Sequence, residues 1–85
     1  MRLRIQPLGE KNLIGARVEA TRKQRGMKQK DLLAQLQVRG VDLNASGLSK
    51  LEGQIRMVTD YELLALSEIL GVSIYWLLTG KEKEI

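Results

Sequence analysis

The apolar residues of this chain recur three and four positions apart along most of its length, and no segment alternates convincingly between apolar and polar residues. Such spacing places side chains on one face of an α-helix. Several short stretches carry it, separated by residues typical of turns. The predicted helices span about residues 10–25, 28–38, 45–53, 60–70 and 74–79. We therefore expect an all-α fold, a compact domain of five short helices.

The same spacing predicts which side chains are buried. The residues expected to point inward are Ile14, Val18, Thr21, Leu32, Leu33, Leu36, Leu48 and Leu51, and Val41, Leu43 and Trp76 are also expected to pack on the core. Glu52 falls on the same side of its helix as two of these leucines. A buried carboxylate needs a partner, because an unpaired charge is costly away from water.

The fourth helix has the clearest start signal. The stretch "TDYE" is a capping box, in which Thr59 caps the helix and Glu62 reaches back to it. Val58 and Leu63 have the spacing of a hydrophobic staple across this start. Gly71 is expected to end the helix after Leu70.

A chain of 85 residues has room for one domain. We expect an N-terminal arm at residues 1–9, a helical domain at residues 10–80 and a frayed tail at residues 81–85. No run of apolar residues approaches the roughly 18 needed for a membrane span. The N-terminus lacks the apolar core of a secretory signal, so we expect a cytoplasmic protein.

The chain contains neither Cys nor His. The usual zinc sites and the Ser-His and Cys-His nucleophile systems are therefore absent. No carboxylate pair stands out either, so we expect no enzymatic activity, no metal, no cofactor and no small-molecule substrate.

Charge is distributed unevenly along the chain. Residues 1–56 contain 12 Lys and Arg against 5 Asp and Glu, a balance of +7, whereas residues 57–85 contain 2 against 5, a balance of −3. Such asymmetry favours a polyanion as the partner of the basic part, although a solvated basic face would give the same count.

Three stretches, "MKQKDLLAQL", "SGLSKLE" and "GVSIYWLLTG", resemble the Cro/C1-type (XRE-like) helix-turn-helix family of phage and bacterial transcriptional repressors. The resemblance extends from about Asn12 to Gly80. It implies a lambda-repressor-like fold that binds double-stranded DNA with its third helix in the major groove. It also implies a repressor that acts as a symmetric homodimer on a palindromic site.

The sequence departs from the family pattern in two ways. "VRGVDLNA" lengthens the connection between the second and third helices, which makes this a long-turn variant. Ala45 and Gly47 stand where Arg or Gln and then Thr are common in the family. One interpretation is that a slim first turn lets the backbone approach the groove closely. The alternative is that Asn44, Ser46 and Gly47 are only cap and turn residues.

The resemblance implies roles for individual residues. The positions that would contact bases are Asn44, Ala45, Ser46, Ser49 and Lys50. Gln29 is implied as a phosphate contact at the start of the second helix, and Lys28, Lys30, Arg39 and Arg56 are further candidates. Arg22, at the edge of the inward face of the first helix, is implied as the partner of Glu52. Tyr75 is an aromatic residue at a position that is commonly polar in the family, and it is a candidate interface residue.

Two other functions compete with DNA binding. A protein-interaction module, such as an antitoxin or adaptor with a degenerate recognition helix, is favoured by Ala45 and Gly47. The basic segment and Gln29 oppose it. An enzymatic function has almost no support, because the chain has no His, no Cys and no obvious carboxylate pair.

Overall fold

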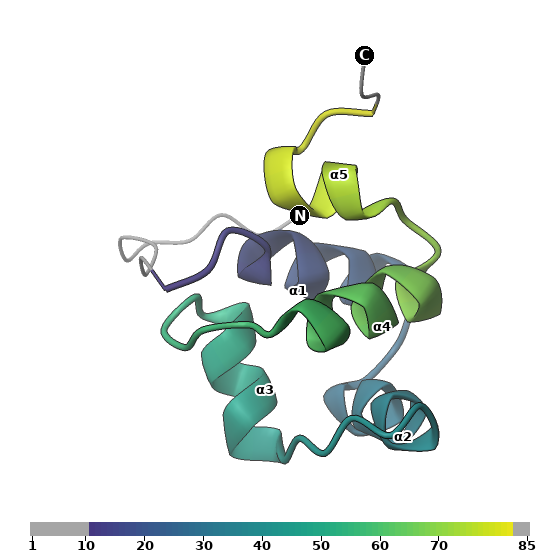
Figure 1. Cartoon of the computed structure of the whole chain (residues 1–85). Coiled ribbons are helices and arrows are strands. Elements are labelled where there is room, and N and C mark those ends of the chain that lie inside the picture. The colour runs from purple at the N-terminus through teal and green to yellow at the C-terminus, as the bar shows by residue number, and fades with distance from the viewer. Residues whose placement is uncertain (1–10, 83–85) are drawn as a thin grey trace.

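The computed structural model describes residues 11–82, and these residues form five α-helices and no strand (Figure 1). The helices are α1 (Gly15–Gln24), α2 (Gln29–Val38), α3 (Ala45–Glu52), α4 (Asp60–Leu70) and α5 (Ile74–Thr79). The predicted all-α fold of five short helices is confirmed. The predicted N-terminal arm and the last residues of the predicted tail lie outside the described residues.

The helices enclose one apolar core. In Figure 1, α1 and α4 cross the middle of the domain, α5 lies on one side of them, and α2 and α3 lie on the other. The buried apolar side chains are Ile14, Val18, Leu32, Leu36, Val41, Leu48, Leu51, Ala65, Leu66, Leu70 and Leu77, with Leu33, Leu43 and Trp76 packed against them. The predicted inward residues are therefore in the core. None of the helices among the described residues has the length and apolar character of a bilayer span.

The start of α4 has the predicted capping box. The backbone N–H of Glu62 donates to Thr59 Oγ1 at 3.2 Å, and the backbone N–H of Thr59 donates to Glu62 Oε1 at 3.0 Å. Val58 and Leu63, the two residues of the predicted staple, both pack against the core. Gly71 follows in the left-handed conformation, with φ of 70°. Local sequence signals thus define both ends of this helix.

The first helix begins later than predicted, at Gly15 rather than near residue 10. Asn12 accounts for the difference, because its Oδ1 accepts hydrogen bonds from the backbone N–H groups of Ile14 (3.0 Å) and Gly15 (2.8 Å). The Asn12 side chain thus satisfies N–H groups at the helix start, where Ile14 is the N-cap position and makes no side-chain cap bond of its own. Asn12 also donates from Nδ2 to the carbonyl oxygens of Leu51 and Arg56, so it joins the start of α1 to the end of α3.

Gly15 of α1 packs directly against the end of α3. A Cβ atom at this position would overlap with the carbonyl oxygen of Leu51 and lie 2.8 Å from Cγ of Gln54. The two helices can approach this closely only because residue 15 has no side chain.

The end of α3 has an unusual backbone residue. Gln54 has φ of 63°, the one non-glycine residue with positive φ among residues 11–82. Its side chain is buried, and its Nε2 donates to the carbonyl oxygen of Asn12 at 2.9 Å. Gly53, one position earlier, has φ of −80°. The left-handed turn therefore falls on a residue whose side chain makes a tertiary hydrogen bond.

Candidate nucleic-acid interface

A connection of six residues, 39–44, joins α2 to α3 (Figure 1), and it is anchored to the core. After α2, the chain turns at Gly40, with φ of 82°, and the N–H of Val41 donates to the carbonyl oxygen of Leu36 at 2.9 Å. Val41 is buried and Leu43 packs against the core, as predicted. The longer turn is therefore held at two points, and it delivers the chain to the start of α3 in a fixed position.

The two faces of α3 separate as the helical spacing predicts. Leu48, Leu51 and Glu52 are buried, and they fix the helix against α1 and α2. The other side presents only small and polar side chains to solvent. The exposed residues there are Asn44, Ala45, Ser46, Ser49 and Lys50, the five predicted base-contacting positions.

Asn44 is the N-cap of α3, since its Oδ1 accepts a hydrogen bond from the N–H of Gly47 at 2.7 Å. This contact uses the side-chain oxygen of an exposed residue, and the amide nitrogen takes no part in it. An exposed amide N–H₂ group can donate to an acceptor on a base edge. A role as a cap and a role at the interface are therefore compatible for this residue.

Glu52 has the partner implied for it. Arg22 Nε and Nη2 donate to Glu52 Oε2 and Oε1 at 2.7 and 3.0 Å, so the pair is bidentate. Arg22 also donates from Nη1 to the carbonyl oxygen of Met27 at 2.9 Å. Both charged side chains are buried. The pair links α1 and the residues before α2 to the end of α3, which fixes the relative orientation of these helices.

Gln29 is connected to the same pair. Its Nε2 donates to Glu52 Oε1 at 3.0 Å, and its Oε1 accepts a long hydrogen bond of 3.5 Å from Ser49 Oγ. The first residue of α2 therefore touches both the buried and the exposed side of α3. Lys28 and Lys30, on either side of Gln29 in the sequence, are exposed. The structure thus brings three of the predicted phosphate-contacting residues together at the start of α2, next to Ser49.

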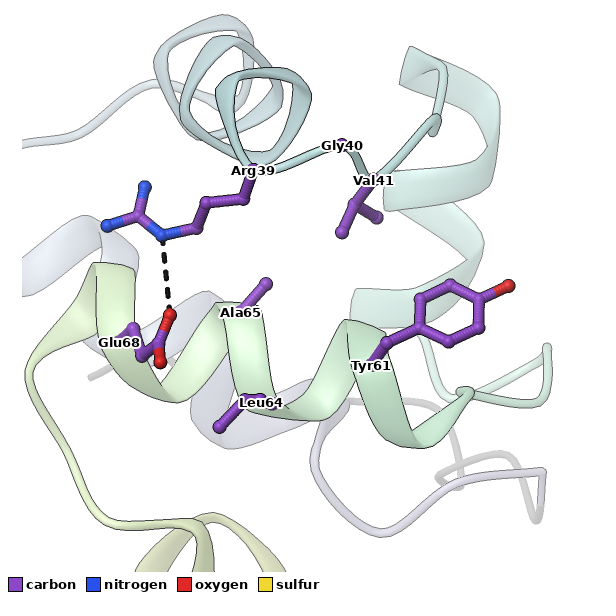
Figure 2. Close-up of a pocket in the computed structure, with 7 residues that line it drawn as sticks. All are labelled: Arg39, Gly40, Val41, Tyr61, Leu64, Ala65 and Glu68. Atoms are coloured by element: carbon purple, nitrogen blue, oxygen red, sulfur yellow. Dashed lines mark ion pairs between the residues drawn. The ribbon is translucent and has the colours of Figure 1, made fainter.

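The two predicted arginine contacts lie in different surroundings, because each is paired with a glutamate of α4. Arg39 Nε lies 3.6 Å from Glu68 Oε1 (Figure 2), and Arg56 Nη1 lies 3.1 Å from Glu62 Oε1. A cation with a carboxylate beside it contributes less net charge to a polyanion than an unpaired one. The sequence indicated both arginines as cations but gave no sign of these partners.

Tyr75 is half-buried on α5, so part of its ring is accessible.

Two residues that sequence analysis missed support α3 from its far end. Asn12 and Gln54 join the start of α1 to the end of α3 through side-chain hydrogen bonds. An N-cap type of residue within the predicted first helix was the available signal for Asn12. Gln54 had none, because its role depends on a partner that is distant in the sequence.

A short helix, a connection and a second helix with one buried and one exposed polar face define a helix-turn-helix domain. A family model described as a helix-turn-helix domain matches residues 15–83. The chain belongs to this family, and the resemblance to its XRE-like, Cro-type members is confirmed. No curated protein and no solved structure gives a significant match. Membership indicates a DNA-binding domain with a role in transcription regulation.

Proposed function

We propose that the chain binds specific sequences of double-stranded DNA, with α3 in the major groove, and represses transcription. The observation that carries the proposal is the exposed row on α3, by which we mean the five exposed residues on one side of this helix and at its cap. They are Asn44, Ala45, Ser46, Ser49 and Lys50. Hydroxyl and ammonium groups can hydrogen-bond to base edges, and Ala45 can contact a thymine methyl group. The opposite side of the helix is fixed to the core by Leu48, so the orientation of the exposed row relative to the rest of the domain is fixed.

The start of α2 supplies the contacts to the DNA backbone in this proposal. Gln29, Lys28 and Lys30 would lie against phosphates, because the first N–H groups of a helix and nearby ammonium groups attract anions. The hydrogen bonds of Gln29 to Glu52 and Ser49 connect this phosphate-contacting group to the base-contacting helix. Arg39 and Arg56 would contribute more weakly, because each is already paired with a glutamate.

A symmetric homodimer on a palindromic site completes the proposal. One helix in the groove reads few base pairs, and a second copy would double the contacts. The exposed part of Tyr75 on α5 is the proposed interface between copies. A repressor of this kind acts where bacterial or phage DNA is found, in the cytoplasm.

Selection of binding sites from random duplex DNA tests the proposal. We expect enrichment of one motif with two inverted halves. The molecular mass of the protein, measured in solution or on the selected DNA, should correspond to two copies of the chain. Replacing Ser46 and Lys50 by Ala should abolish the enrichment without unfolding the chain, because both side chains are exposed. Recovery of unrelated sequences by the unchanged protein would overturn the proposal.

A protein-interaction module is the second candidate, and one surface favours it. A shallow groove of about 280 Å³ lies between the α2–α3 connection and α4 (Figure 2). Its lining includes Val41, Ala65, Tyr61 and Leu64, with Arg39 and Glu68 at one end. Tyr61 and Leu64 are strongly exposed for apolar residues, at 62% and 49%. If the protein enriches no DNA sequence and binds duplex DNA without salt dependence, this second function is favoured.

A further inference from the structure

Leu43, the last residue of the long connection before the cap, lies against the first turn of α3. A Cβ atom built on Gly47 would lie 2.8 Å from Cδ1 of Leu43 and 3.2 Å from Oδ1 of Asn44. Cβ contacts below 3.0 Å are essentially never found in real structures. The terminal methyl group of Leu43 would therefore have to move to admit any other residue at position 47.

The small residues at the start of α3 could be explained by a close approach of the helix backbone to DNA. The contact between Leu43 and Gly47 gives a different explanation. Gly47 lies in a regular helix, where Gly is the least favourable residue apart from Pro. Its backbone does not need glycine, since among the described glycines only Gly26, Gly40, Gly71 and Gly80 have positive φ. The close constraints on a side chain at position 47 are the Leu43 side chain and, at 3.2 Å, Oδ1 of Asn44.

The rest of the connection holds Leu43 in place. Val41 is buried two residues earlier, and Leu43 itself packs against the core. Leu43 and Leu48 have the N′ and N4 positions of a hydrophobic staple around the Asn44 cap. The first turn of α3 is thus bounded by the cap on one side and by Leu43 on another. This turn carries Ala45 and Ser46 of the exposed row.

We infer that Leu43 is a positioning residue for the DNA-contacting helix, and that it acts through its contact with Gly47. The long connection supplies a side chain that sets the direction of the first turn of α3, and the glycine provides the space for it. This inference rests on the proposed function, because the direction of that turn determines where Ala45 and Ser46 would meet the bases.

The test is a cycle of Leu43→Ala, Gly47→Ala and the double variant, each measured by unfolding in denaturant. Gly→Ala within a helix normally raises the folding equilibrium constant about fivefold, because Ala is the better helix former. We expect most of this gain in the Leu43→Ala background, where Oδ1 of Asn44, at 3.2 Å, is the close atom that remains. In the unchanged background the gain should vanish or reverse, since Leu43 has to move. If Gly47→Ala raised the folding equilibrium constant equally in both backgrounds, Leu43 would not constrain position 47.

The positioning role has its own readout, the ratio of affinities for the selected site and for random duplex DNA. Gly47→Ala should lower this ratio by about tenfold or more, the loss of one good base contact, when Leu43 is present. In the Leu43→Ala background the same change should leave the ratio almost unaltered. If Gly47→Ala lowers the ratio equally in both backgrounds, its methyl group meets the DNA directly and Leu43 has no positioning role. An unchanged ratio in both backgrounds also overturns that role and leaves only a packing contact.

Gly53→Ala is the matched control, the same change at the other end of α3. A Cβ atom there would lie 3.3 Å from the nearest atom, the carbonyl oxygen of Ser49, and it would not approach Leu43. We expect no change in the affinity ratio and no dependence on residue 43. Failure of the unchanged protein to prefer any DNA sequence would overturn the proposed function, whereas the unfolding cycle would still decide whether the contact exists.

Discussion

Arg22 and Glu52 form a bidentate ion pair inside the domain, with N–O distances of 2.7 and 3.0 Å and with both residues at least 94% buried. Removal of one partner leaves the other charge buried without its counter-charge, which costs about 3–5 kcal/mol. We expect Arg22→Met to lower the free energy of unfolding by about this amount, a large part of the stability of a small domain. Denaturant unfolding measures the change.

The double variant Arg22→Met with Glu52→Leu should recover much of that loss, since apolar packing can replace a buried ion pair. Lys23→Met is the control for loss of a cation on the same helix. Lys23 contacts Glu19 at 3.3 Å but is half-exposed, so its loss should cost under about 0.5 kcal/mol. Additive effects of the Arg22 and Glu52 changes, with coupling below about 0.5 kcal/mol, would mean that the pair does not form in solution.

The affinity for duplex DNA should fall steeply as salt is added. Residues 1–56 carry a balance of +7, and counterion release contributes a slope of roughly −0.9 per phosphate contact to the plot of log affinity against log salt concentration. Several contacts for each copy predict a slope of about −4 or steeper. Lys30→Gln should make the slope shallower, whereas Lys81→Gln, in the acidic part of the chain, should not. A flat salt response would argue against DNA as the partner.

Base contacts and phosphate contacts should be separable by substitution. Ser46→Ala and Lys50→Ala should weaken binding to the selected site more than binding to random DNA, by roughly 1–3 kcal/mol for each good contact. Gln29→Ala should weaken both kinds of binding, because phosphate contacts carry no sequence information. Competition binding with the selected duplex and a scrambled one gives the ratio. An unchanged ratio for Lys50→Ala would show that α3 is docked differently or does not read bases.

Gly15→Ala should be strongly destabilising, although Ala normally stabilises a helix. The added methyl group would overlap with the carbonyl oxygen of Leu51, a backbone atom that cannot rotate away. Overpacking of this kind costs about 1–3 kcal/mol and occasionally more. Gly53→Ala provides the comparison, because its new Cβ atom has more space and its backbone is already helical. Equal unfolding midpoints for the two variants would mean that α1 and α3 are less closely packed than described.

Gln54 allows backbone strain to be measured separately from a side-chain contact. Gln54→Ala removes the hydrogen bond to Asn12 and keeps a side chain in the left-handed conformation. Gln54→Gly removes the same hydrogen bond but relieves the strain, which is worth roughly 1–2 kcal/mol for a residue with a Cβ atom. The Gly variant should therefore be the more stable of the two by about 1 kcal/mol. The opposite order in thermal unfolding would show that φ at this position is not positive in solution.

The sequence by itself determined the helical class and most of the helix positions. Helices α2 to α5 begin and end within a residue or so of the predicted bounds, because caps such as Thr59 and stops such as Gly71 act within one turn of the chain. The inward face of α3, including buried Glu52, also followed from spacing alone. These features depend on neighbours three or four positions away, and a sequence displays such neighbours directly.

Tertiary structure alone decided the features that depend on residues distant in the sequence. Asn12, whose side chain accepts from N–H groups at the start of α1, is held by the end of α3, and the buried side chain of Gln54 donates to the carbonyl oxygen of Asn12. The connection before α3 packs on the core, and that places the Leu43 side chain against Gly47. The sequence indicates Arg39 and Arg56 as cations without partners, yet each forms an ion pair with a glutamate of α4. Spacing along the chain indicates which face a residue occupies, but only the packed fold determines which atoms it meets there.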